Sequence, residues 1–224
     1  MRNASPPLLT LLALATLSTA ASATTLPAGD FVMAIVSANQ SCCQVVDLDA
    51  ATLAATVISS GGYLSMPGDI TVTAGGAILV TVAPTGLVRI APGDGAQTVL
   101  ASPATFGGDT PAGVTAAGER IYLSLQGTDP RVVEIDENGA VLRTVTRDGL
   151  LTLPAGMAVG PDGALYVCET IPLMALAGGA LVRVDLATGT QTLVASGKPL
   201  YGPFQLAFAA DGSIWSVQHG IAST

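Results

Sequence analysis

Two side chains near the C-terminal end of the chain have the chemistry for acid–base catalysis. Glu169 ends an apolar run, and His219, the only histidine in the sequence, follows a similar run one repeat later. A carboxylate and an imidazole on neighbouring units could share a proton or a cation, which is the minimum for acid–base or metal-assisted chemistry. The alternative is a strand-end acid and a loop histidine that both face water. We favour this alternative, because no other suitable ligand recurs at the aligned positions, and we predict no metal site.

The three cysteines give weaker indications of site chemistry. Cys42 and Cys43 are adjacent, and a disulfide between neighbours is strained, so a bridge between them that stiffens their loop is only one hypothesis. Cys168 lies in an apolar run and is predicted to be a small buried residue. No histidine or second cysteine pair accompanies the three cysteines, which argues against a zinc site.

These candidate residues are positioned by a repeat. Similar segments begin at Pro67, Pro111, Pro154 and Pro203, spaced 44, 43 and 49 residues apart. A period of roughly 40 to 50 residues is typical of propeller blades, each of which is too small to bury its own faces. The copies are predicted near 29–65, 66–109, 110–152 and 153–201, with a partial copy at 202–224.

Each copy contains short runs rich in Val, Ile and Leu, separated by turns such as Pro161–Gly163 and Ala187–Gly189. Runs of this length and composition predict strands, and the turn residues predict hairpins. The fold class is therefore all-β, a β-propeller of four-stranded antiparallel blades. About three to four blades are present, because the first copy supplies three strands and the last supplies two. We expect an incomplete part of a six- or seven-bladed ring, with a compact four-bladed ring as the alternative.

Two further features concern the surface and the core. Tyr122, Tyr166 and Trp215 occupy equivalent strand positions and are predicted to lie in the core between blades. The segment 171–179 is an apolar insertion in a loop, on the face where ligands usually enter a propeller. Its residues Ile171, Pro172, Leu173 and Met174 are predicted either to contact a ligand or to pack over the channel mouth.

The N-terminus has the pattern of a secretory signal peptide. Arg2 precedes an apolar run from Leu8 to Leu17, and small residues up to Ala23 follow. This order predicts export with cleavage after Ala23, so that residues 1–23 are the signal peptide and 24–224 the propeller. A transmembrane anchor is the alternative, but Thr10, Thr16 and Ser18 interrupt the run.

The best repeat resembles a known group of propellers. The segment Leu153–Thr170, with its Pro-Asp-Gly-Ala-Leu-Tyr step, and the Val182–Gly189 hairpin are similar to repeats of the NHL and streptogramin lyase-like propellers. This resemblance implies a propeller fold from about Gly29 onward. Streptogramin lyase-like enzymes use a histidine and glutamates around a magnesium ion, which would point to His219 and Glu169.

Gluconolactonase-type propellers are also similar in repeat pattern. They hold a metal with acidic and asparagine side chains, with asparagine where this chain has Ala155 or Phe204. After the signal peptide the chain has only Asn39 and Asn138, at other positions, so this metal site is not expected.

Composition limits the partners. The net charge is −8, or −9 without the signal peptide, which argues against nucleic acid or anionic lipid as a partner. We predict an exported, secreted or periplasmic scaffold that binds a protein, peptide or carbohydrate through its loop face. It needs no cofactor and no membrane once the signal peptide is removed, and we lean against an enzyme. The alternative is a metal-dependent lyase or lactone hydrolase, with a divalent cation and part of the active site beyond the chain end.

Overall fold

The computed structural model describes residues 10–16, 31–36, 43–170 and 178–218. Their strands form five antiparallel sheets, each in chain order, called blades 1 to 5 below. Blade 1 contains β1 (Thr10–Thr16), β2 (Phe31–Val36), β3 (Cys43–Leu48) and β4 (Ala55–Ser60). Blade 2 contains β5 (Pro67–Val72), β6 (Ile78–Val82), β7 (Gly86–Ile90) and β8 (Gln97–Ala101). Blade 3 contains β9 (Thr110–Ala117), β10 (Arg120–Gln126), β11 (Arg131–Ile135) and β12 (Val141–Arg147). Blade 4 contains β13 (Pro154–Val159), β14 (Leu165–Glu169), β15 (Ala180–Val184) and β16 (Gln191–Ser196). Blade 5 contains β17 (Pro203–Phe208) and β18 (Ile214–Gln218).

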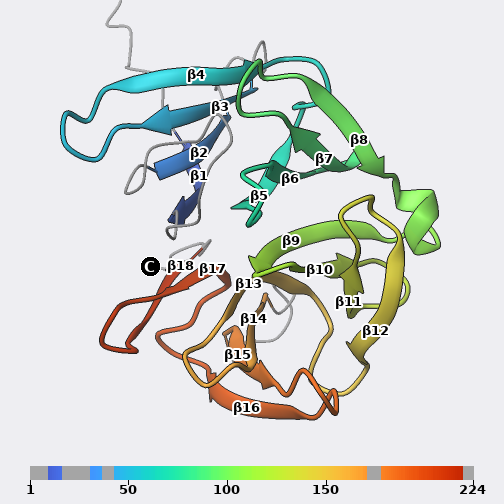
Figure 1. The fold of residues 1–224 in the computed structure, drawn as a ribbon. Helices are drawn as coiled ribbons and strands as arrows, with labels where there is room; N and C mark the ends of the chain where they lie inside the picture. The colour runs from blue at the N-terminus through green and yellow to red at the C-terminus, as the bar shows by residue number, and fades with distance from the viewer. Residues whose placement is uncertain (1–9, 17–30, 37–42, 171–177, 219–224) are drawn as a thin grey trace, which may run out of the picture.

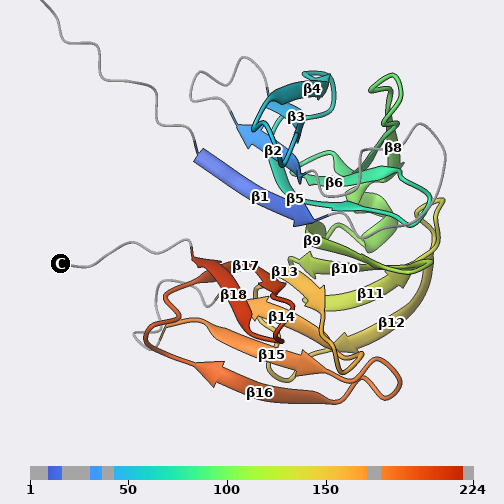
Figure 2. The same cartoon turned by 60° about the vertical axis from the view of Figure 1, so that its left-hand side comes forward.

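The blades follow one another along an arc. The first strands β1, β5, β9, β13 and β17 lie toward the middle, and the fourth strands β4, β8, β12 and β16 lie along the outside (Figure 1). After a turn of 60°, the two-stranded blade 5 is seen beside β13 and β14 of blade 4 (Figure 2). The predicted fold class, all-β with four-stranded propeller blades, is confirmed.

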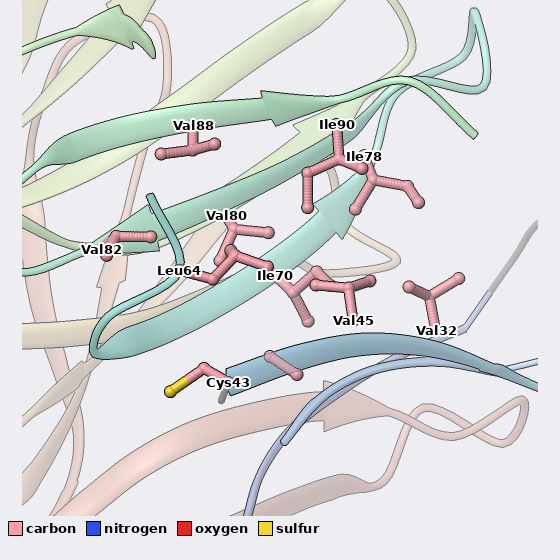
Figure 3. Close-up of a cluster of buried hydrophobic side chains, with 11 residues drawn as sticks. Val32, Cys43, Val45, Leu64, Ile70, Ile78, Val80, Val82, Val88 and Ile90 are labelled. Atoms are coloured by element: carbon pink, nitrogen blue, oxygen red, sulfur yellow. The ribbon is translucent and has the colours of Figure 1, made fainter. Parts of the chain in front are cut away.

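Apolar side chains on facing blades hold the arc together. Between blades 1 and 2, Val32 and Val45 point toward Ile70, Val80 and other buried residues of β5 to β7 (Figure 3). The second and third strands read as almost continuous apolar runs because both of their faces are covered by neighbouring blades. Full burial of each such Val, Leu or Ile side chain contributes about 1.5–3 kcal/mol.

One face of the arc carries the links between blades. Each first strand begins there, each second strand ends there, and each fourth strand ends there before the chain passes to the next blade. We call this end the link face, after its links 61–66, 102–109, 148–153 and 197–202. The link from blade 2 to blade 3 includes a short 3-10 helix, η1 (Pro103–Phe106), whose Phe106 is buried.

The first blade has more strands than its sequence predicts. Three strands were expected in copy 29–65, but β1 pairs antiparallel with β2 and makes a fourth. β1 lies inside the apolar run that resembles a signal peptide. A buried strand and a signal peptide both consist mainly of apolar residues, so one run can match both patterns. Cleavage after Ala23 would therefore remove β1 and leave β2, β3 and β4. Within the described ranges, no helix has the length and apolar character needed to cross a membrane.

The predicted core position of the three aromatic residues is confirmed for only part of the set. Tyr122 is 1% exposed, and Tyr166 packs edge-to-face on Phe208 with ring centroids 5.0 Å apart. Trp215 is 70% exposed, so its prediction was wrong. The three residues do occupy equivalent strand positions, but among the described strands blade 5 contains only β17 and β18, whereas blades 3 and 4 have four strands each.

Candidate functional site

Glu169 lies at the link-face end of β14. It stands opposite Pro154 of β13 and Ala180 of β15, so strands flank it on both sides. Its side chain is only 2% exposed. The alternative in which this carboxyl group faces water is therefore wrong, because its neighbouring strands and link exclude solvent from it.

The two oxygens of the Glu169 carboxyl group differ. Oε1 accepts hydrogen bonds from the Thr152 hydroxyl and from the Leu153 backbone N–H, both at 2.5 Å. Oε2 is buried and has no hydrogen-bond partner among the described residues. Burial raises the pKa of Glu169, against the opposing effect of these hydrogen bonds. Burial therefore favours the neutral, protonated form of this carboxyl group more than in an exposed glutamate.

Comparison with the other blades separates a structural role from a chemical one. The residues opposite the first-strand proline in blades 2, 3 and 5 are Val82, Leu125 and Gln218. Gln218 Oε1 accepts the N–H of link residue Tyr201 at 2.8 Å, much as Glu169 accepts that of Leu153. The side chain at this position thus accepts a link N–H in blades 4 and 5. Of the four residues Val82, Leu125, Glu169 and Gln218, only Glu169 carries a carboxyl group.

Several predicted site residues lie outside the described residues. These are His219, Cys42 and the loop residues Ile171, Pro172, Leu173 and Met174. The ends that flank them are described, and the Thr170 hydroxyl donates to the Pro203 carbonyl at 2.8 Å. The strand that carries Glu169 therefore reaches β17, but a pairing of Glu169 with His219 stays a hypothesis that the described residues do not test.

A second buried carboxyl group was missed from the sequence. Asp69 of β5 is 3% exposed, and its oxygens accept the N–H groups of Ile70 at 2.7 Å and Val114 at 2.9 Å. Because Val114 belongs to β9, Asp69 joins the inner strands of blades 2 and 3. Burial raises the pKa of Asp69 to about 7, although the two N–H groups and the Gln205 amide lower it in part.

The Gln205 amide influences the pKa of Asp69 from blade 5. Gln205 lies on β17, and its Nε2 has no partner in hydrogen-bonding geometry among the described residues. Its Oε1 lies over Gly156 of β13, where a Cβ atom would come closer than 3.0 Å to it. Two residues after each blade proline the sequence reads Asp69, Gly113, Gly156 and Gln205. The two polar residues and two glycines at this position were the available signal, because Gly156 leaves room for the Gln205 side chain.

Hydroxyl groups bind successive inner strands together beside Asp69. Thr81 accepts the Asp69 N–H at 2.8 Å and donates to the Ala112 carbonyl of blade 3 at 2.9 Å. Ser124 repeats this between blades 3 and 4, with both distances 2.7 Å. Cys168 occupies the same position in β14. Its burial agrees with the prediction of a small core residue, and burial raises the pKa of its thiol to about 12, which keeps it protonated.

The remaining cysteine chemistry is limited. The Cys43 thiol donates to the Ser65 carbonyl at 3.2 Å. Because Cys42 lies outside the described residues, the Cys42–Cys43 bridge stays an untested hypothesis. Among the described residues, no group of three or more His, Cys, Asp or Glu side chains is placed to hold a metal ion.

No protein-family model matches the chain, and no curated protein matches it in sequence. Solved structures do match its fold. Virginiamycin B lyase from Staphylococcus aureus aligns with a TM-score of 0.58 and 17% identity, over 93% of this chain and 63% of that protein. TolB from Acinetobacter baumannii gives 0.64 and 16%, over 91% and 47%. Regucalcin, a calcium-binding protein from Agrobacterium tumefaciens, gives 0.62 and 14%, over 95% and 68%.

These similarities establish the fold. The resemblance to streptogramin lyase-like and gluconolactonase-like propellers, expected from the repeats, is confirmed at that level. The chain spans 63% and 47% of the lengths of the lyase and TolB.

Proposed function

We propose that this chain is an exported β-propeller that binds a protein, peptide or carbohydrate through its link face. The observation that carries the proposal is a set of large apolar side chains exposed in the links. These are Tyr63, Met66, Leu150 and Tyr201, exposed by 49%, 64%, 39% and 51%. Tyrosine and methionine offer large contact areas and are enriched in binding surfaces.

The same face supplies a polar contact. Glu169 ends there with a buried Oε2 that has no partner in the described part of the chain. Because neighbouring strands and the link cover this oxygen, a ligand would reach it only if these segments move apart. Apolar contacts around a few placed polar groups are the usual composition of a binding site.

Export rests on separate support. The order of Arg2, an apolar run and small residues up to Ala23 is that of a secretory signal. One similar structure is described as the extracellular domain of a putative one-component system from B. thetaiotaomicron. It aligns with a TM-score of 0.58 and 10% identity, over 93% of this chain and 26% of that one.

The binding role can be tested without knowing the ligand. The full chain is immobilised and screened against a phage-displayed peptide library and a glycan array. Binders should be lost in a Tyr63→Ser, Tyr201→Ser double variant and kept in Leu142→Ser, a control on the outer strand β12 where Leu142 is 61% exposed. Binders that tolerate the double variant, or a failure to recover any, would contradict the proposal.

A second candidate function is a metal-dependent lyase or lactone hydrolase. It is favoured by one observation, the buried Glu169 with a raised pKa, because such groups are frequent among catalytic acids. Virginiamycin B lyase is similar in fold. Calorimetric titration with Mg²⁺ tests this candidate: binding that Glu169→Gln and His219→Ala both abolish would support it. Absence of Mg²⁺ binding and of lyase or lactonase turnover would exclude it.

A further inference from the structure

One arginine in the described part of the chain lacks the partner that the others have. The other arginines of this part each form an ion pair with an aspartate or glutamate side chain. Arg89 of β7 forms no ion pair and no side-chain hydrogen bond with any residue there, and it is only partly exposed. A guanidinium group carries five N–H donors, so its partial withdrawal from water without an acceptor costs free energy.

The position of Arg89 carries a charged residue in every four-stranded blade. It lies on the third strand, opposite a residue of the second strand. The residues at this position are Asp47, Arg89, Glu134 and Arg183. In blade 3, Glu134 accepts a hydrogen bond from Arg143 Nε at 2.7 Å. In blade 4, Arg183 Nε donates to Asp162 Oδ2 at 2.8 Å. In these two blades, therefore, the charge has a partner of opposite sign within the same blade.

The partner of Arg183 lies in the turn that joins β13 to β14, and blade 2 has the same kind of turn between β5 and β6. In turn 160–164 the N–H of the first residue donates to the carbonyl of the fifth at 2.8 Å, and in turn 73–77 this distance is 2.9 Å. In both turns the fourth N–H donates to the first carbonyl at 2.9 Å. Asp162 is the third residue of its turn, and Gly75 is the third residue of the other. Arg89 thus lacks a carboxylate because a glycine stands in its place.

The space beside Gly75 is open. Apart from its chain neighbours, a Cβ atom at Gly75 would have only Thr73 Oγ1 within 4 Å, at 3.9 Å. In turn 160–164 the Ala164 N–H donates to Asp162 Oδ1 at 3.2 Å, whereas in turn 73–77 the equivalent N–H donates to Thr73 Oγ1 at 3.1 Å. The Thr73 hydroxyl accepts this bond and keeps its own proton for a further acceptor. Blade 2 therefore has the cation of this arrangement and a hydroxyl donor, and the place of the acid is open.

We propose that Arg89 and turn 73–77 bind the carboxylate group of an external ligand. We call this the Arg89 site. The carboxylate takes the place that the Asp162 side chain has in blade 4, where it accepts N–H groups of Arg89 and the hydroxyl of Thr73. Guanidinium and carboxylate groups are both planar and can form two parallel hydrogen bonds. The turn joins the end of β5 to the start of β6, on the opposite side of the arc from the link face, so the inference does not depend on the proposed function.

The charge of the chain determines how such a ligand is held. The net charge is −8, so the field of the whole protein disfavours an anion at a distance. At physiological ionic strength this field is screened beyond about 8 Å, whereas a partly buried contact with Arg89 is screened much less. Short-range hydrogen bonds therefore hold the carboxylate. Its source is a small free acid or an aspartate or glutamate side chain of a polypeptide.

Nuclear magnetic resonance of the full, isotope-labelled chain tests the contact directly. Each arginine gives an Nε–Hε signal, and the variant Arg89→Lys identifies the signal of Arg89. When acetate is added at constant ionic strength, the Arg89 signal should shift and reach saturation. The signal of Arg183 is a control within the same spectrum and should not move, because Asp162 already occupies its guanidinium group. Acetamide, the neutral analogue of acetate, should move neither signal.

Two reciprocal variants test the role of the turn. Gly75→Asp gives blade 2 the carboxyl group that blade 4 has, and Gly75 is not among the glycines with positive φ, so its backbone accepts a side chain. In this variant the affinity of Arg89 for acetate should fall by at least about tenfold. Asp162→Gly removes the partner of Arg183 and should make the Arg183 signal respond to acetate. Circular dichroism shows whether each variant keeps its strands, and each tests the site independently of the other.

A second titration distinguishes the two sources of the carboxylate. The probe is the capped tripeptide acetyl-Gly-Asp-Gly-amide, with acetyl-Gly-Asn-Gly-amide as its neutral control. Tighter binding of the aspartate tripeptide than of acetate would support the site and assign it to a polypeptide side chain. Equal or weaker binding of the tripeptide, with acetate bound, would support the site and assign it to a small free acid.

Two results would overturn the proposal. The first is an Arg89 signal that moves with neither acetate nor the aspartate tripeptide. The second is a shift that Gly75→Asp leaves unchanged, or that Arg183 shares in the unaltered chain, because either would show a general effect of the added salt and not a site at Arg89.

Discussion

Asp69 and Gln205 stand at equivalent places in blades 2 and 5, two residues after the blade proline, and the Gln205 amide acts to lower the pKa of the buried Asp69 carboxyl group. The glycines Gly113 and Gly156 occupy the same place in the blades between them. Asp69 also accepts the Val114 N–H of β9 at 2.9 Å, so this buried acid bridges strands that are 45 residues apart, and its ionisation is coupled to folding.

The first prediction concerns pH and stability. Burial raises the pKa of Asp69 to about 7 in the folded chain, from 3.8. Between pH 3.8 and about pH 7, the folded chain holds a proton on Asp69 that the unfolded chain releases. The free energy of unfolding should therefore fall as pH rises toward 7, by at most about 1.4 kcal/mol per pH unit for this one group.

Urea unfolding of the full chain at pH 5, 6, 7 and 8 measures this slope. Glu169 contributes in the same direction, since its pKa is also raised. Asp162 and Asp185 have lowered pKa values, so their contributions are lost only at more acidic pH. Asp69→Asn should flatten the slope whatever its effect on absolute stability. An unchanged slope would show that Asp69 ionises normally in the fold.

The repeat in the sequence was sufficient to predict the blades but not this bridge. Prolines at 43- to 49-residue spacing and apolar runs of strand length form a local pattern, which follows from burial of both sheet faces. The contact of Asp69 with Gln205 depends on how the blades curve around a common centre. No local pattern encodes that curvature, and sequence reasoning examined the neighbouring positions Ala155 and Phe204 instead.

The second prediction concerns Cys168, which stands where Thr81 and Ser124 hold their bridging hydroxyls. Cys168→Ser should be tolerated to within about 1 kcal/mol, because a hydroxyl there can form the hydrogen bonds seen at Ser124. Cys168→Ala provides neither the hydroxyl nor the volume and should destabilise the chain more. Thermal melts of the two variants decide the order, and a serine variant less stable than the alanine variant would contradict it.

Reactivity of the Cys168 thiol is a third prediction. Burial raises its pKa to about 12, and the residue is fully buried, so the folded chain should react very slowly with a thiol reagent at this position. A Cys42→Ser, Cys43→Ser variant isolates its signal. Reaction should become fast in denaturant. Fast labelling without denaturant would show that blade 5 leaves β14 more often than the packing implies.

The fourth prediction concerns the glutamines that join outer strands. Gln191 Nε2 donates to the Thr146 hydroxyl at 2.8 Å, and its Oε1 accepts the Leu150 N–H at 2.6 Å. Gln97 makes the same pair of contacts with Ser59 and Tyr63. Gln191→Ala should cost about 1–3 kcal/mol, because it leaves polar groups of the neighbouring blade without partners. Leu193→Ala, at an exposed place on the same strand, should cost much less. Equal losses in urea unfolding would contradict a specific role for the glutamine.

The site itself was only half predictable. Glu169 was found from its place at a strand end, but its burial was not, because the residues that cover it come from a link and from two flanking strands. The prediction for Trp215 failed in the opposite sense, because this residue is exposed and not buried. Its strand position predicts burial, yet what buries that position is a neighbouring element, and the sequence of β18 does not specify whether one is present.

The fifth prediction concerns the N-terminal segment, where two structural outcomes compete for the same residues. Residues 10–16 form β1 against β2 in the full chain, but they also lie in the predicted signal peptide. If export occurs, mass spectrometry of the exported protein should give a mature chain that begins at Thr24, with β1 removed and the β2 edge exposed. Ala23→Arg, which blocks the cleavage site, should retain β1. Hydrogen exchange at Val32 and Ala34 should then be slower in the retained form, because β1 pairs with both residues. An exported chain that keeps Met1 and shows slow exchange would instead identify β1 as a permanent strand of blade 1.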